Sequence, residues 1–235
     1  MKKSHIATLI VFLVLIPLTL ILGSRLSGRA FYVTSTLVIV ELLIPFFLAF
    51  EGRRPQAREL VVLAVMCALA VAGRVAIPIP SFKAIFGIIM IAGIAFGPES
   101  GFLVGAISAL ASNFFYSQGP YTPWQMMAYG AGGMLAGFVF ARGRLPRKPV
   151  IMGIFGFLAV TFFVGPLLDT CSVFLVMSRI TLKGAMAFYI SGFPVNLRQA
   201  VATAIVLLVL GTPLLEKLDR IKTKYGILDD GGKEA

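Results

Sequence analysis

The chain has 235 residues, of which 58% are hydrophobic and 13% charged, and its mean hydropathy is +0.94. Soluble domains carry about 25% charged residues, so this composition excludes an ordinary soluble domain and indicates an integral membrane protein. The net charge of +11 would suggest nucleic-acid binding in a soluble chain. In a membrane protein it is typical of basic cytoplasmic loops, and we expect no nucleic-acid partner.

A membrane-spanning helix needs about 20 apolar residues, and apolar runs of roughly this length recur along the whole chain. Because they recur, the first run is expected to be a retained helix and not a cleaved signal peptide. The sequence therefore predicts an all-α membrane bundle with about eight spans. We expect these helices at 6–22, 31–50, 59–77, 83–97, 100–117, 123–141, 149–170 and 194–212.

Two connections between these runs carry structural information. The fourth and fifth are separated only by Gly97-Pro98-Glu99-Ser100, a tight turn that predicts an antiparallel pair. Residues 171–193 are apolar but contain Arg179 and Lys183. We expect them to extend the seventh helix and then to form an interfacial segment.

The distribution of lysine and arginine predicts the orientation. With a cytoplasmic N-terminus, fourteen of these residues fall in inner segments and five in outer loops. This bias favours both termini inside and an even number of spans. The charged RRPQARE linker then divides the chain into an N-terminal transmembrane hairpin (1–52), a six-helix substrate-binding membrane domain (53–213) and a basic cytoplasmic tail (214–235).

Polar and aromatic side chains gather near the outer ends of the predicted helices. Such groups are costly inside a membrane, and their convergence from several segments predicts an outward-facing binding pocket. Gly119-Pro120 cannot continue a helix and shapes a fixed loop beside them. The candidate binding residues are Arg74, Asn113, Gln118, Tyr121, Trp124, Gln125, Tyr129, Asp169, Asn196 and Arg198.

Ordinary membrane roles remain open for these residues. Tyr121, Trp124 and Tyr129 are also typical of an interfacial aromatic belt. Arg74 and Arg198 could snorkel to the outer headgroups.

The same holds for the polar residues deeper in the helices. Asp169 could pair with an arginine, and Asn113 could bind a neighbouring helix. Glu41, in the middle of the second predicted span, is either a functional carboxylate or a hydrogen-bonding group within the hairpin.

Small residues form a second pattern. Ala64, Ala68 and Ala72 recur every four residues and share one face of the third predicted span. Such a face permits close packing within the bundle or docking of a partner membrane protein. The glycines at 130, 132, 133 and 137 favour close packing of the sixth span.

The sequence lacks the residues that several kinds of chemistry require. The chain has one histidine, His5, and its two cysteines lie in apolar runs without metal-ligand spacing, so neither a metal nor another cofactor is expected. There is no GxxxxGK[ST], HExxH or GxSxG motif. Nothing in the sequence supports an enzyme or an ATPase.

The six-helix unit resembles the S components of energy-coupling factor (ECF) transporters, the substrate-binding membrane subunits of these importers. The motifs that carry the resemblance are LAVMCALAVAGRV (63–75), AFGPESGFLVGAISA (95–109), SQGPYTPWQMMAYGAGG (117–133) and GFPVNLRQAVAT (192–203). The resemblance implies a multi-pass protein of a prokaryotic plasma membrane that binds a vitamin outside. Energy would come from a membrane coupling subunit and two ATPases.

By the same resemblance, the alanine face docks on the coupling subunit, and the substrate lies at the outer end under the loops at 78–83, 117–123 and 171–193. The QGPYTPWQM loop with PVNLRQA resembles the cobalamin and corrinoid branch. The N-terminal hairpin departs from the six-span pattern of the family.

Two other functions remain open from the residues alone. The first is an ion- or proton-coupled secondary transporter that uses Glu41 or Asp169. The second is a membrane enzyme, for which the sequence offers neither paired carboxylates nor a nucleophile–base pair at the interface.

Overall fold

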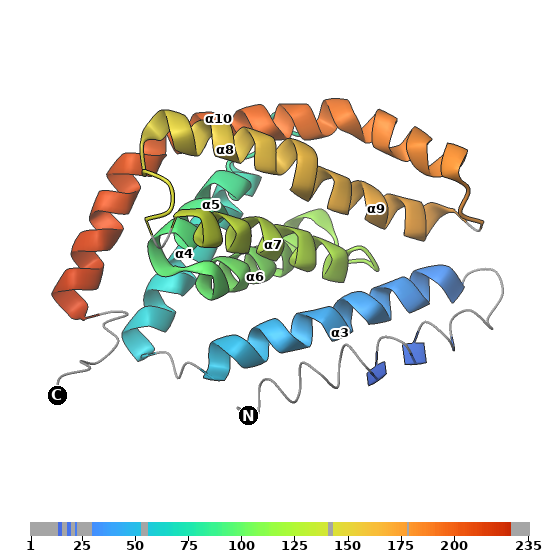
Figure 1. The fold of residues 1–235 in the computed structure, drawn as a ribbon, viewed down its shortest axis with the longest axis horizontal. Helices are drawn as coiled ribbons and strands as arrows, with labels where there is room; N and C mark the ends of the chain where they lie inside the picture. Colours follow the sequence, from blue (N-terminus) through green and yellow to red (C-terminus); the bar gives the residue numbers. More distant parts are fainter. Residues whose placement is uncertain are drawn as a thin grey trace.

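The computed structural model describes residues 14–15, 18–19, 22, 30–52, 56–140, 143–177 and 179–226. Every regular element in these ranges is a helix (Figure 1), which confirms the all-α fold class. The main elements are α3 Ala30–Gly52, α4 Ala57–Val75, α5 Ile85–Phe96, α6 Pro98–Tyr116, α7 Thr122–Phe140, α8 Pro149–Ala159, the π-helix η2 Val160–Val164, α9 Gly165–Val176 and α10 Leu182–Tyr225.

Two helical runs in the described ranges are long and apolar enough to cross a membrane, Pro149–Val176 and Leu182–Tyr225. The first of them joins α8, η2 and α9. Its π-helix ends two residues before Pro166, whose ring and missing N–H disturb a regular α-helix. The predicted span at 6–22 lies almost wholly outside the described residues, and the number of eight spans stays a prediction.

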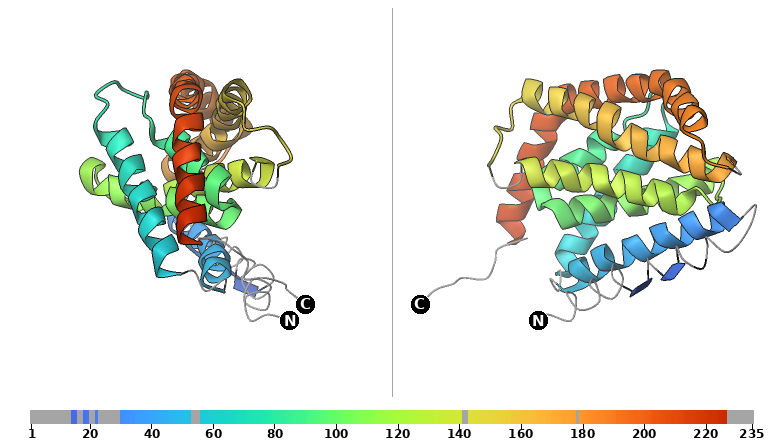
Figure 2. Two further views of the ribbon diagram at one scale, coloured as in Figure 1. Left: turned by 90° about the vertical axis from the view of Figure 1, so that its left-hand side faces the viewer. Right: turned by 45° about the vertical axis from the view of Figure 1, so that its right-hand side comes forward.

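α6 and α7 lie side by side at the centre of the bundle (Figures 1 and 2). The α8–α9 run and α10 flank them on one side and α3 on the other. α5 contacts α6, α7 and α10, and all 12 of its residues are buried. α4 packs against α5 and α6. The ends of α4, α6 and α9 at Val75, Tyr116 and Val176, with the start of α7, are called the outer end here.

Glycines bring the backbones of α6 and α7 together. A Cβ atom added at Gly101 would lie 2.5 Å from the carbonyl oxygen of Gly133. One added at Gly105 would collide with the Tyr129 carbonyl group, and Gly137 meets Pro98 in the same way. Any larger side chain at these positions would force the helices apart. The predicted packing role of the glycines in this span is confirmed.

The turn between α5 and α6 consists of Gly97 alone. Its φ of +95° is a backbone conformation that side chains disfavour. Pro98 occupies the first turn of α6, where its missing N–H has no helical partner to lose. The antiparallel pair predicted from this turn is present, with a connection shorter than the one expected.

α10 differs from the sequence prediction at both ends. Residues 171–176 extend the seventh helix as expected, but residues 182–193 do not form a segment separate from the next helix. Instead α10 begins at Leu182, where the side chain of Thr181 accepts a hydrogen bond from the Gly184 N–H, and it continues through Pro194 and Pro213. The predicted helix at 194–212 is therefore only the middle of a helix of 44 residues.

Polar contacts explain why α10 runs on into the predicted basic tail, as far as Tyr225. Arg147 donates a hydrogen bond to the Ile94 carbonyl oxygen (3.2 Å), and Lys222 donates one to the Ala95 carbonyl oxygen (2.7 Å). Both cations also approach Asp219, at 3.2 and 3.8 Å. They cap the carboxyl end of α5, where free carbonyl groups attract positive charge. The last turns of α10 are thereby held against the bundle.

The glycine contact yields a stability prediction. Gly101→Val should lower the free energy of unfolding by about 1–3 kcal/mol or more, because the added side chain overfills the contact between α6 and α7. Thermal unfolding in detergent measures the effect. Leu110→Phe adds bulk on the exposed face of the same helix and should leave the midpoint unchanged. Equal midpoints for the two variants would contradict the close approach.

Candidate functional site

A hydrogen-bonded network joins α4, α6 and α7 at the outer end. The guanidinium group of Arg74 donates to the side-chain oxygens of Ser112 (2.5 Å) and Asn113 (2.8 Å). The Asn113 amide in turn donates to Gln125 (2.8 Å) and Thr122 (3.3 Å). Asn113 and Ser112 are fully buried. Polar groups this deep are stable because each has partners, and they fix the three helix ends relative to one another.

The loop at 117–121 is attached to this network by its own side chains. Thr122 donates to the Gln118 side-chain oxygen (2.9 Å) and accepts from the Gly119 N–H (3.1 Å). The Gln118 amide also donates to the Leu110 carbonyl oxygen (2.9 Å), and Tyr121 donates to the Ser117 carbonyl oxygen (2.7 Å). The loop therefore has a defined shape above the helix ends.

Aromatic rings enclose the charge of Arg74. Its guanidinium carbon lies 4.9 Å from the ring centroid of Tyr116 and 5.6 Å from that of Tyr129. Tyr129 is buried and meets Phe86 edge to face at 4.5 Å. Arg74 thus points into the bundle, among rings and amides, and not outward as a snorkelling arginine does.

Besides Tyr116, sequence reasoning missed three further members of this region. Ser112 and Thr122 are buried within the network. The Lys83 ammonium group donates to the Ile77 carbonyl oxygen and lies 5.9 Å from the Tyr116 ring, and its backbone accepts from Gln199 (2.6 Å). Ser112 lies next to Asn113 in the sequence, and that adjacency was the one available signal. In the sequence, Lys83 is simply a charged residue in an outer loop.

Asp169 and Asn196 form a second cluster, between α9 and α10. The Asn196 amide donates to the Asp169 carboxylate at 2.7 Å. Gly192 faces the carboxylate and Gly165 faces the amide, so both side chains fit between closely packed backbones. In the described part of the chain Asp169 makes no ion pair with an arginine, the alternative considered from the sequence. Its partner is a neutral amide.

Trp124 and Arg198 lie apart from these two clusters. Trp124 is buried, stacks on Phe174 at 5.6 Å with an interplanar angle of 26°, and has no hydrogen-bond partner for its indole N–H. Arg198 is exposed, and its guanidinium group donates to the Pro194 carbonyl oxygen, one turn earlier on its own helix, at 3.3 Å. The structure thus places most of the predicted residues in one of these two clusters and leaves Trp124 and Arg198 outside both.

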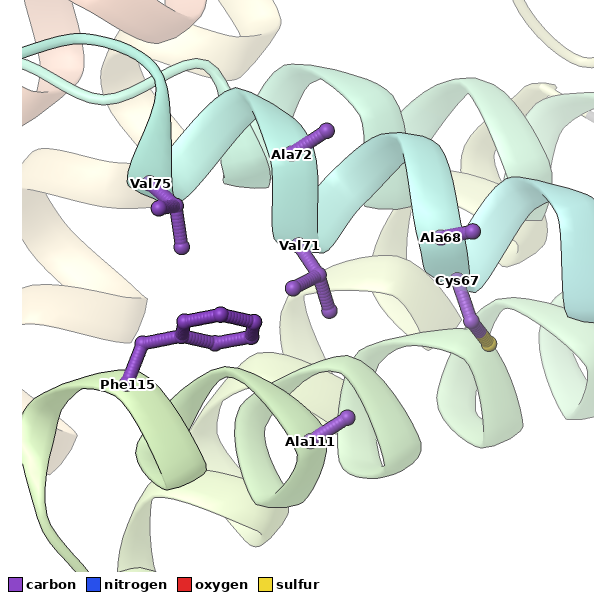
Figure 3. Close-up of a pocket in the computed structure, with 7 residues that line it drawn as sticks. All are labelled: Cys67, Ala68, Val71, Ala72, Val75, Ala111 and Phe115. Atoms are coloured by element: carbon purple, nitrogen blue, oxygen red, sulfur yellow. The ribbon is translucent and has the colours of Figure 1, made fainter.

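The alanine face of α4 is exposed at Ala64, Ala68 and Ala72. Beside it, an apolar groove of about 480 Å³ runs between α4 and α6 (Figure 3). Val71 and Val75 of α4 point toward α6, and the ring of Phe115 lies between the two helices. The groove is lined by Cys67, Ala68, Val71, Ala72, Val75, Ala111 and Phe115.

These observations define the class of the protein: a helical membrane protein with a polar network at one end of its helices and an exposed apolar flank. Comparison with known families identifies the particular family. The model of the family described as "ECF-type riboflavin transporter, S component" matches residues 55–217, and the chain belongs to this family. No curated protein and no solved structure matches the chain. The resemblance to ECF S components is confirmed, the corrinoid branch is not, and α3 lies outside the matched region.

The network yields a testable coupling. In a double-mutant cycle, Asn113→Ala and Gln125→Ala should show an interaction free energy of about 0.5–3 kcal/mol, because they remove the same hydrogen bond. Asn196 shares no partner with Asn113, so Asn113→Ala and Asn196→Ala should add within about 0.3–0.5 kcal/mol. The free energy of unfolding in mixed micelles measures both. Additivity in the first pair would show that the network is absent.

Proposed function

We propose that this chain is the substrate-binding S component of an ECF-type importer and binds a vitamin at its outer end. The observation that carries the proposal is the network around Arg74 and Asn113, where α4, α6 and α7 present a cation, amides and rings at one depth. A few convergent polar groups among apolar and aromatic walls are typical of small-molecule sites. The charge distribution favours an orientation with this end outside the cell.

The preferred substrate is riboflavin, because the family description names a riboflavin transporter. The site residues also favour a narrow ligand. They bind one another directly, at 2.5–3.3 Å, so a flat ring system need displace only a few side chains. A corrinoid macrocycle is far wider and would require several helix ends to separate. Cobalamin, which the loop motifs favoured, is the alternative substrate.

Each group has a role in this proposal. Arg74 and the amides of Gln118 and Gln125 hold the polar chain and carbonyl oxygens of the ligand by hydrogen bonds. Trp124 stacks on its planar ring. The Asp169–Asn196 pair orients the outer halves of α9 and α10 around it. Exposed Arg198 serves entry of the ligand and not its final binding.

Delivery needs a separate energy source. The chain has no Walker motif, and the proposed partners are a membrane coupling subunit and two ATPases. The exposed alanine face of α4 suits the contact with the coupling subunit, because small residues let another helix approach closely and slide. Vitamin binding and docking thus occupy different faces of α4.

Purified protein without partner subunits should bind riboflavin, and calorimetry measures the Kd. Arg74→Gln should weaken binding at least about tenfold, because hydrogen bonds to a charged group contribute about 1.5–3 kcal/mol. Arg198→Gln is the matched control and should leave the Kd nearly unchanged. Binding of cobalamin in place of riboflavin would contradict riboflavin as the substrate and leave the proposed S-component function in place. Binding of neither, with uptake driven by a pH gradient, would overturn the function.

The docking face calls for a separate experiment. Ala68→Leu should abolish vitamin uptake by the complete importer while the Kd of the isolated chain stays unchanged, because a large side chain blocks close helix approach. Ile154→Phe adds bulk on the exposed face of α8 and is the control. Normal uptake by Ala68→Leu would place the docking surface elsewhere.

A further inference from the structure

α3 precedes the region that the family shares, yet it packs directly on the helices of the site. It contacts α6, α7 and α9, and it lies on the side of α6 and α7 opposite α8 and α10 (Figures 1 and 2). Ile39, Leu43 and Phe47 recur every four residues and form its inner face. Leu43 packs against Phe102, and Phe47 meets the Phe102 ring edge to face at 6.5 Å. Ile39 packs against Trp124 and Cys171.

Trp124 lies beneath this helix with an unused donor. The residue is 8% exposed, between Ile39 of α3 and Phe174 of α9, and its indole N–H has no hydrogen-bond partner. A buried donor without a partner is costly, and a role in binding a ligand is one reason for a protein to keep such a donor. Because this N–H is buried, a ligand can reach it only if part of the surrounding packing moves.

α3 also holds the loop above the site. The Thr36 hydroxyl donates to the Pro120 carbonyl oxygen at 3.3 Å. Pro120 belongs to the loop that Gln118 and Thr122 attach to the polar network. One helix therefore contacts both the loop and Trp124, from positions one turn apart.

The packing of α3 is the kind that separates most easily. α6 and α7 interlock through glycines, whereas α3 presents Ile39, Leu43 and Phe47. In lipid no hydrophobic effect holds such apolar surfaces together. The mid-helix carboxylate of Glu41 accepts a hydrogen bond from Thr19, at 2.6 Å. Both residues belong to the N-terminal hairpin, so this hydrogen bond does not attach α3 to the rest of the bundle.

We propose that α3 is a lateral gate of the vitamin site: Thr36 and Ile39 hold the loop and cover Trp124, and displacement of α3 opens the indole N–H to substrate. This inference rests on the proposed function for its substrate, but the cover itself is testable without one. Thr36 and Ile39 are positioning residues, since they act through the loop and through Trp124. Because α3 covers the site both before and after the ligand binds, weakening its contacts should speed both the entry and the release of the ligand.

Stopped-flow binding of riboflavin tests the gate. Thr36→Val removes the hydroxyl at nearly constant shape and should raise the association and dissociation rates together by about fivefold, the factor for one hydrogen bond of about 1 kcal/mol. Thr36→Ser keeps the donor and should retain the rates of the unchanged protein. A merely structural role would lower the fraction of active protein and leave both rates unchanged. Unchanged rates in Thr36→Val overturn the gate.

Lipid access to Trp124 tests the cover in the absence of vitamin. Trp124 is the only tryptophan, so quenching of its fluorescence by brominated phosphatidylcholine reports on this site alone. Ile39→Ala should increase quenching and speed the reaction of Cys171 with N-ethylmaleimide in a Cys67→Ser background. Val40→Ala, on the exposed face of α3, should change neither. Equal quenching in the two variants overturns the gate even if riboflavin binds. A failure of riboflavin to bind overturns the proposed function and leaves the quenching result valid.

Discussion

The rest of this structure depends on the close approach of α6 and α7. Gly101 and Gly105 meet the carbonyl groups of Gly133 and Tyr129, so the two backbones are in direct contact. About two turns further along α6, Asn113 meets Gln125 of α7 at 2.8 Å. Amide side chains are short, and a wider helix separation would place their atoms beyond hydrogen-bonding distance. The glycine contact therefore sets the geometry of the polar site as well as the stability of the bundle.

Polar contacts at the two ends of the bundle, together with the glycine contacts, fix how the helices are arranged. Lipid offers no hydrophobic gain when apolar helices associate, so buried polar groups and close packing must specify their arrangement. At the outer end Arg74 links α4 to α6. At the other end Arg147 and Lys222 cap α5 and hold the last turns of α10. α3 has neither glycine contacts nor such a network in the described residues, and this difference sets it apart from the six-helix unit.

Much of the fold was predictable from the sequence because hydrophobic runs and turn residues are local signals. The helices from α3 to α7, the Gly97 turn and the family itself all followed from such signals. α10 did not, because Lys183 and Pro194 are read locally as breaks. Both are tolerated where the helix packs along α9 and α8. The same limit applies to the site: Arg74 and Asn113 stood out as costly polar groups, whereas Lys83 and Thr122 are unremarkable until their partners are known.

By itself, the sequence determined that this is a helical membrane protein of the ECF S component family, which polar groups lie near its outer helix ends, and which helices can pack closely. These properties depend on composition and spacing along the chain. Only the tertiary structure decided that Asp169 faces Asn196 and not an arginine, that Arg198 stays outside, and that α3 covers Trp124. Such pairings depend on the rotation and crossing of helices far apart in sequence, which packing of the whole bundle selects.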